Sequence, residues 1–213
     1  MSVAGTSSNG IAPKRPIPRD DDEPSVGKKE KKTVQVPPSK PKLDVTCLHH
    51  ETGKLAWIST DVLLTYAQIQ TTGTEYELVD PLCFNAVDKR RLVSRIEKKL
   101  SDGKTGVLFP ICTNSHWRLL LIRTKVYFYD PLGGTADVNV KLFARLLNKV
   151  VVDLSGQVPL QTDRWNCGVF VMLMLRSIVT GQLWRREEAE EKVAAFRKEF
   201  LEQLKTTHDV FHS

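Results

Sequence analysis

The longest apolar run in the chain begins immediately after Cys167 and Gly168, and it limits the folds that the sequence can adopt. The run Val169–Leu175 continues to Thr180 without a proline or another breaker. Strands usually hold five or six residues, so a run of this length predicts a helix rather than a strand. A helix that is apolar on all sides is buried, so other elements have to cover it.

Four further segments have the spacing of amphipathic helices. Ser59, Thr60 and Asp61 are typical helix-start residues. They precede an apolar stripe that consists of Val62, Leu63, Tyr66, Ala67 and Ile69. The other three helices are predicted over Asp88–Leu100, Val138–Val150 and Arg186–Leu204.

Short apolar runs of strand length fill the centre of the sequence. They are Val107–Ile111, Trp117–Ile122 and Val126–Tyr129, with one more strand expected at either Val151–Leu154 or Val158–Leu160. Turn-like residues separate these runs. Helices on both sides of a group of strands predict an α+β domain.

The first 42 residues differ in composition from the rest of the chain. They hold seven prolines, no aromatic residue and few apolar ones. Such a segment cannot bury enough surface to offset the entropy of ordering, so we predict a disordered tail. Two basic clusters, residues 14–15 and 28–32, resemble a bipartite nuclear-import signal. Residues 14–32 would then bind an import receptor and direct the protein to the nucleus; the alternative is a solubilising charged tail.

The net charge of +6 lies mainly in this tail. Residues 1–42 carry nine Lys/Arg and five Asp/Glu, which leaves +2 for residues 43–213. A nearly neutral domain argues against a nucleic-acid-binding surface. No apolar run approaches the roughly 20 residues that span a bilayer. The N-terminus also lacks the apolar core of a secretory signal, so we expect an intracellular protein without a membrane segment.

The four cysteines of the chain form no C-x-x-C pair. This usage is typical of a reducing compartment and predicts no disulfide framework. Cys47 lies close to His49 and His50. Adjacent histidines rarely share one metal, however, and no second ligand pair follows, so no metal site is predicted.

Cys167 lies at the predicted start of the buried helix, where the positive end of the helix dipole favours a reactive thiolate. Its neighbour Gly168 would let a substrate backbone approach closely. The alternative is a buried structural cysteine, which is the commoner state of a free cysteine. His116 precedes a strand, and from there it can act as a general base toward a thiol. The alternative is a solvated surface histidine, which is the commoner state of an isolated one.

Asp130 directly follows the strand Val126–Tyr129. If that strand pairs antiparallel with Trp117–Ile122, its end lies beside the start of its partner. The Asp130 carboxylate would then be able to orient the imidazole of His116. The alternative is an ordinary turn aspartate before a proline.

Gln161 lies six positions before Cys167. Its amide can donate a hydrogen bond to the oxyanion that forms when a thiolate attacks a carbonyl, together with the backbone N–H of Cys167. The alternative is a polar loop residue.

The order of these residues resembles the signature of the ubiquitin-like-protein-specific proteases, which include the SUMO and NEDD8 proteases and, more distantly, the adenovirus endopeptidase. The shared features are His116-Trp117, Asp130 after two aromatic residues, Gln161 six positions before the cysteine, and Cys167-Gly168-Val169-Phe170. The segment Ala56–Val62 also resembles the Trp-Leu-x-x-Asp helix start of that family. Together these stretches cover about residues 55–204.

The resemblance implies a papain-like cysteine protease fold, with a central mixed or antiparallel sheet flanked by helices, and a catalytic domain over residues 43–213. The implied roles are Cys167 as nucleophile, His116 as base, Asp130 as its orienting group and Gln161 as oxyanion donor. Trp57 and Trp117 would form a narrow tunnel for a Gly-Gly terminus, because flat indole walls exclude larger side chains. Core packing is the alternative for both. No cofactor is required.

Some features depart from the family pattern. Asn166 stands where the family usually has Asp, and the segments before Val107 and between Asp130 and Gln161 are short. Because those segments help to grip the ubiquitin-like protein in the family, the modifier is not fixed by the sequence.

We expect hydrolysis of a peptide or isopeptide bond after the Gly-Gly terminus of a ubiquitin-like modifier, with SUMO favoured over NEDD8 and ubiquitin. Alternatives within the class are a deubiquitinase and a polyprotein-processing protease. An acetyltransferase can use the same residue types. An inactive module that binds ubiquitin-like proteins is the alternative of another class.

Overall fold

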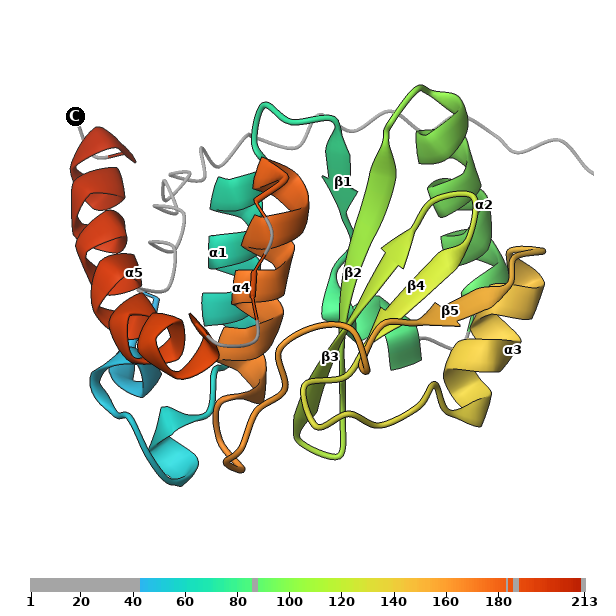
Figure 1. The fold of residues 1–213 in the computed structure, drawn as a ribbon. Coiled ribbons are helices and arrows are strands. Elements are labelled where there is room, and N and C mark those ends of the chain that lie inside the picture. Colours follow the sequence, from blue (N-terminus) through green and yellow to red (C-terminus); the bar gives the residue numbers. More distant parts are fainter. Residues whose placement is uncertain (1–42, 86–87, 183, 186–187, 212–213) are drawn as a thin grey trace, which may run out of the picture. The chain divides into compact units, whose positions relative to one another are not determined.

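The computed structural model describes residues 43–85, 88–182, 184–185 and 188–211. Its centre is a five-stranded mixed sheet with the order β1-β2-β3-β4-β5 (Figure 1). The strands are β1 (Tyr76–Leu78), β2 (Gly106–Thr113), β3 (His116–Ile122), β4 (Val126–Tyr129) and β5 (Val151–Asp153). The three central strands are antiparallel, and the outer pairs β1–β2 and β4–β5 are parallel.

The central strands read as continuous apolar runs because both faces of the sheet are buried. Side chains alternate between the faces along a strand. In β2, Leu108 faces one apolar cluster, whereas Val107 and Phe109 face the other. The same alternation in β3 sends Leu119 and Leu120 to opposite clusters.

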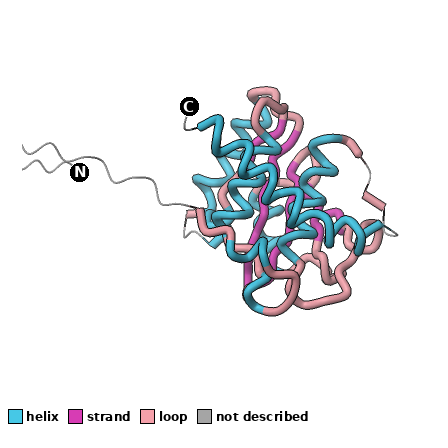
Figure 2. The backbone as a smooth tube through the Cα atoms, turned by 90° about the vertical axis from the view of Figure 1, so that its left-hand side faces the viewer, coloured by secondary structure: helices cyan, strands magenta, loops and turns pink. Residues whose placement is uncertain are grey.

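Two groups of helices cover the two faces. The helices α1 (Thr60–Thr71), α4 (Cys167–Thr180) and α5 (Ala189–Phe211) lie on one side, and α2 (Lys89–Ser101) and α3 (Val138–Leu146) lie on the other (Figure 1). Figure 2 looks at the molecule from the α5 side, and helices lie in front of the strands in that view. The apolar run after Cys167 is α4, which contacts β3, α1 and α5. The predicted buried helix is therefore confirmed.

Local capping explains where the other predicted helices begin. The Ser59 hydroxyl accepts a hydrogen bond from the Val62 N–H, and the Asp88 carboxylate accepts one from the Arg91 N–H. Both residues are among the preferred N-cap types, because their side chains satisfy first-turn N–H groups. The predicted starts of α1 and α2 are correct to within one residue.

The helix predicted over Val138–Val150 is too long, since α3 ends at Leu146. Asn148 has the left-handed φ of 52°, and the Lys149 N–H donates to the Ala144 carbonyl. These contacts form a Schellman motif that ends the helix and frees Val151 to start β5. The strand prediction Val151–Leu154 is thus the correct one of the two alternatives.

Several short elements were missed. They are β1 and three 3₁₀ turns: η1 (Thr46–His49), η2 (Lys54–Ala56) and η3 (Pro81–Asn85). The last helix begins at Ala189 rather than Arg186 and extends beyond Leu204. Within the described ranges, no helix has the length and apolar character needed to cross a membrane. The tail prediction for residues 1–42, with its import signal at 14–32, lies outside the described residues.

Candidate active site

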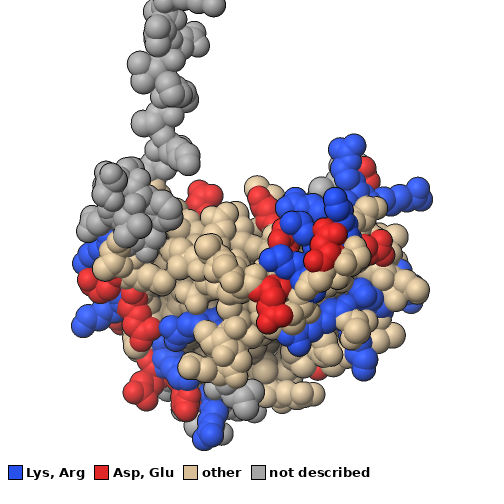
Figure 3. Space-filling model, turned by 90° about the horizontal axis from the view of Figure 1, so that it is seen from above, with Lys and Arg blue, Asp and Glu red and all other residues tan. Residues whose placement is uncertain are grey.

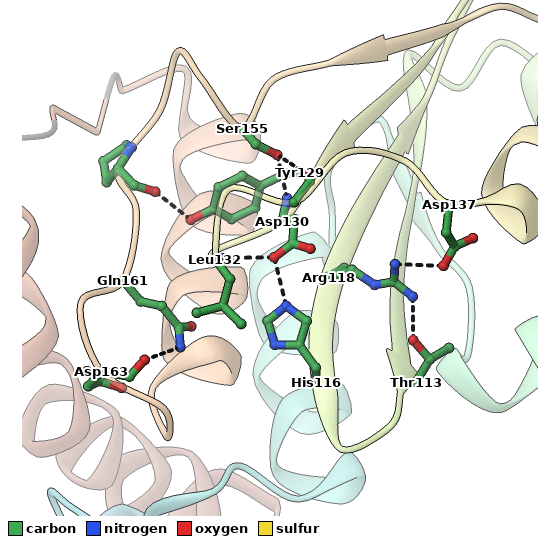
Figure 4. A network of polar contacts seen from close by, with 12 residues as sticks. Thr113, His116, Arg118, Tyr129, Asp130, Leu132, Asp137, Ser155, Gln161 and Asp163 are labelled. Atoms are coloured by element: carbon green, nitrogen blue, oxygen red, sulfur yellow. Dashed lines mark hydrogen bonds and ion pairs between the residues drawn. The ribbon is translucent and has the colours of Figure 1, made fainter.

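The β3–β4 hairpin brings His116 and Asp130 together. In this antiparallel pair Leu119 lies opposite Tyr129, so the start of β3 is next to the residue that follows β4. The His116 Nε2 and Asp130 Oδ1 atoms are 2.7 Å apart (Figure 4). That distance is typical of a charge-assisted hydrogen bond, and it leaves Nδ1 as the ring nitrogen available to a thiol.

Several backbone and side-chain groups hold the Asp130 carboxylate in place. The Leu132 N–H donates to Oδ1 at 2.8 Å, and the Ser155 hydroxyl accepts from the Asp130 N–H at 3.1 Å (Figure 4). Gly134 packs directly against the carboxylate, since a Cβ there would lie 2.6 Å from Asp130 Oδ2. Gly134 is therefore a close neighbour of the site.

The pKa values of this pair move in opposite directions. Burial raises the pKa of Asp130, but hydrogen bonds from His116 and Leu132 and the charges of His116 and Arg118 hold it below its usual 3.8. Burial lowers the pKa of His116, whereas hydrogen bonds with Asp130 and Cys167 and their charges raise it to about 9. Both shifts favour an ion pair at neutral pH.

Cys167 is the first residue of α4, and its side chain is buried. It is also a close electrostatic neighbour of His116, since it helps to raise the pKa of that imidazole. A thiol, an imidazole and a carboxylate are therefore neighbours, in the order that a cysteine nucleophile, its base and the orienting group require.

The packing around α4 explains why residue 168 is a glycine, and the explanation differs from the predicted one. A Cβ at Gly168 would lie 2.5 Å from Ile58 Cβ and 3.2 Å from Trp117 Cδ1. The space beside the glycine is thus filled by the protein itself rather than left open for a substrate. Close approach of α4 to β3 requires the glycine here.

The two tryptophans predicted to form a tunnel differ in exposure. Trp117 is 4% exposed, and its indole N–H donates to the Ile58 carbonyl at 2.8 Å. Trp57 is 39% exposed and directly precedes Ile58, which contacts both Trp117 and Gly168. Trp57 is therefore partly open to solvent, whereas Trp117 packs mainly in the core.

Gln161 is buried on the loop that leads to α4. Its backbone N–H donates to the Pro131 carbonyl, and its side-chain Nε2 donates to the Asp163 carbonyl at 2.8 Å (Figure 4). The amide oxygen has no protein partner. One amide N–H is thus committed to the loop, and the second is the one that remains for an oxyanion.

Sequence reasoning missed several buried polar residues that support this geometry. Arg118 interrupts the apolar β3 strand and donates to Asp137, the N-cap of α3, at 2.9 Å. A charged residue within an apolar strand was the available signal, because a buried charge requires a partner. Asp163 and Arg197, described below, carried no such local signal. The described residues contain no group of three metal-ligating side chains.

Comparison with known proteins shows which solved structures have a similar fold. No protein-family model matches the chain, and no curated protein matches its sequence. A solved structure of a de-sumoylating protease is 17% identical, with a TM-score of 0.55 over 76% of this chain and 84% of that one. SUMO protease Ulp1 with its catalytic cysteine oxidized to a sulfinic acid is 14% identical, with a TM-score of 0.50 over 59% and 67%.

The chain has the fold of the SUMO proteases. The predicted α+β class and the protease fold are therefore confirmed. At these identities the likeness concerns the fold, and the chemistry has to be argued from the residues described above.

Proposed function

We propose that this protein is a cysteine peptidase that cleaves peptide or isopeptide bonds after the Gly-Gly terminus of a ubiquitin-like modifier, with SUMO as the favoured one. The observation that carries the proposal is the 2.7 Å contact between His116 and Asp130 together with Cys167 as the next neighbour of the imidazole. A structural cysteine needs neither a charged imidazole nor a carboxylate behind it. A thiol that attacks carbonyls needs both.

In the proposed reaction, the Cys167 thiolate attacks the carbonyl carbon of the terminal glycine. The resulting oxyanion accepts hydrogen bonds from the backbone N–H of Cys167 and from the Gln161 amide. The His116 imidazolium then protonates the leaving amine, so that the C–N bond breaks and a thioester remains. A water molecule, deprotonated by the neutral imidazole, attacks the thioester and releases the carboxylate.

The partial exposure of Trp57 supports selection of glycine next to the scissile bond. Trp57 directly precedes Ile58, which packs against Gly168 at the start of α4, so its indole can supply a flat apolar wall for the substrate tail. A Gly-Gly tail would fit against such a wall, whereas larger residues would clash with it.

A nucleic-acid-binding function receives no support from the surface charges in view. Lys/Arg and Asp/Glu side chains are interspersed on the face seen from above (Figure 3). Binding to a phosphate backbone relies on a continuous basic surface.

The test is labelling with probes that carry a C-terminal electrophile on SUMO, NEDD8 or ubiquitin, followed by mapping of the adduct by mass spectrometry. We expect the SUMO probe to label Cys167 and the Cys167→Ser variant to remain unlabelled. Cys112→Ser is the matched control, because Cys112 lies in β2 opposite Trp117 and is partly exposed. It should label as wild type does.

The outcomes separate the alternatives. Selective labelling by the ubiquitin probe would instead identify a deubiquitinase. If no probe labels the protein while a small alkylating agent still modifies Cys167, the proposal fails in favour of a polyprotein-type peptidase or an acyltransferase. Binding of SUMO without labelling or turnover would identify an inactive binding module.

We also propose that residues 14–32 direct the protein to the nucleus through an import receptor, because two basic clusters lie there at bipartite spacing. Fusion of residues 1–42 to a fluorescent reporter should concentrate it in nuclei. Replacement of the lysines at 28–32 with glutamine should abolish that effect.

A further inference from the structure

Arg197 on α5 is an arginine buried among neutral acceptors. It is 4% exposed, and its guanidinium donates to the carbonyls of Cys47 at 2.6 Å and Ala56 at 2.8 Å. A third bond runs from Nη2 to Asn166 Oδ1 at 2.7 Å. Among the described residues it donates to these neutral acceptors and to no carboxylate, although a buried charge normally requires a paired one. This arrangement indicates that Arg197 has a role other than forming an ion pair.

The bond to Asn166 connects Arg197 to the loop before the proposed nucleophile. Asn166 Nδ2 donates to Asp163 Oδ2 at 2.8 Å. The other oxygen of Asp163 accepts the backbone N–H groups of Trp165 and Asn166, and the Asp163 carbonyl accepts from Gln161. One network therefore joins α5, the loop 161–166 and the segment 47–56.

This network uses both polar ends of the Asn166 side chain, and this has a consequence for α4. Asn166 occupies the N-cap position, where asparagine normally accepts a hydrogen bond from a first-turn N–H. Here it makes no such bond, and its backbone (φ −94°, ψ 8°) lies outside the extended region typical of N-caps. Among the described residues, the N–H groups of Cys167, Gly168 and Val169 have no hydrogen-bond acceptor.

Unpaired N–H groups at a buried helix start are unusual, because nearly all buried donors find an acceptor. In an enzyme that attacks carbonyls, they are what the developing oxyanion needs. An asparagine that capped α4 in the ordinary way would take the N–H of Gly168 or Val169 away from the substrate.

We propose that Arg197 is a positioning residue, which holds the Asn166 side chain away from α4 so that the N–H groups of its first turn stay open to the substrate carbonyl. The catalytic part of this inference rests on the proposed hydrolase function. The structural part does not, since it concerns only which acceptor the first-turn N–H groups have. Two measurements therefore test the inference separately.

The first measurement is kinetic and compares Arg197→Met with Lys198→Met. Lys198 is exposed on the same helix and makes no ion pair within the described residues, so it is a matched control. With a SUMO C-terminal amide substrate, we expect kcat of Arg197→Met to fall about 10- to 100-fold while KM stays within threefold. Alkylation of Cys167 by iodoacetamide, which forms no oxyanion, should change less than threefold. Arg197→Lys keeps the charge but lacks the fork of donors, so its kcat should be intermediate.

A merely structural Arg197 predicts a different pattern, in which kcat and the alkylation rate fall together with thermal stability. That result, or an unchanged kcat in Arg197→Met, would overturn the inference. Wild-type protein that hydrolyses none of the substrates would contradict the proposed function instead, and the second measurement then decides the structural part.

The second measurement is backbone amide hydrogen exchange by NMR at Cys167, Gly168 and Val169. In Arg197→Met the released Asn166 side chain should cap α4 and slow exchange at one or more of these amides at least fivefold. If Arg197→Met does not fold, Asn166→Ser serves instead, because serine is a preferred N-cap and has too short a side chain to reach both Arg197 and Asp163. It should slow exchange in the same way and lower kcat without lowering Tm. Exchange as in wild type in a folded variant would refute the inference.

Discussion

The two halves of the candidate site are held by different kinds of contact. His116 and Asp130 are only 14 positions apart and lie on neighbouring strands of one hairpin. Cys167 and Gln161 lie on a loop and helix start whose polar contacts reach Arg197 and, through it, residues 141 and 150 positions away from it in the sequence. The positions of His116 and Asp130 are therefore specified locally, whereas the position of Cys167 depends on elements distant in sequence.

If the hairpin half supplies the proton transfers, removal of the His116 imidazole should have the largest effect on activity. His116→Ala should lower kcat/KM of SUMO-substrate cleavage by about 10³-fold, since general acid–base groups contribute 10²- to 10⁴-fold. Steady-state kinetics with a SUMO C-terminal substrate measures this. Equal activity in the variant would mean that another group acts as the base.

Gly134 offers a way to disturb the hairpin half without removing a polar group. In Gly134→Ala the new Cβ would lie 2.6 Å from Asp130 Oδ2 and should displace the carboxylate. We expect kcat to fall about 10- to 30-fold, because misplaced catalytic groups lose much of their effect. Gly156→Ala is the control, since no atom lies within 4 Å of a Cβ there. If both variants keep wild-type kcat, close packing at Gly134 is unimportant for catalysis.

The raised pKa of His116 predicts the alkaline limb of the pH profile. Because the pKa rises from 6.5 to about 9, His116 stays protonated at neutral pH, and the proton for the leaving amine is lost above about pH 9. We expect kcat/KM to fall about tenfold per pH unit beyond that point. In Asp130→Asn, which removes the carboxylate, the limb should move to lower pH.

Stability should follow the same ionisation. A raised folded-state pKa stabilises the fold fully below pH 6.5, and this contribution is lost as pH rises through about 9. Thermal unfolding of wild type should therefore show a decline in Tm between these values that Asp130→Asn lacks. An identical pH dependence of Tm in both proteins would argue against the ion pair.

The smallest effect should come from a contact that supports the hairpin half from outside the hairpin. The Ser155 hydroxyl accepts from the Asp130 N–H and donates to the Gly134 carbonyl. Ser155→Ala should cost about 1 kcal/mol of unfolding free energy and lower kcat no more than threefold. Chemical denaturation and kinetics measure the two effects. A loss of kcat as large as that of Gly134→Ala would show that the Ser155 contact positions Asp130 as strongly as the packing of Gly134 does.

The same contrast explains what could be predicted from sequence. The hairpin, the capped starts of α1 and α2 and the buried helix α4 follow from periodicity and neighbouring residues, so they were predicted correctly. The end of α3 was not, because it depends on the left-handed conformation of Asn148, which a non-glycine residue seldom adopts. The edge strand β1 has only three residues and pairs with a strand about 30 positions later, so it has no periodicity of its own.

The candidate site shows more clearly where prediction from the sequence stops. The hairpin geometry predicted that His116 and Asp130 meet, and the structure brings them together. The partners of Arg197 could not be predicted, because nothing within several residues of it distinguishes a buried arginine on an amphipathic helix from an exposed one. Which surface a helix buries, and against what, is decided by the whole fold.

The hydrogen bonds of Arg197 also form late during synthesis. Translation produces the hairpin with His116 and Asp130 first and Cys167 later, but Arg197 follows Asn166 by another 31 residues. Until α5 is made and docks, the nascent chain holds the thiol and the imidazole without the contacts that fix the loop 161–166. Under the proposed function, a protease assembled in this order would remain inactive on the ribosome, where its own chain and its neighbours are still unfolded and most easily cut.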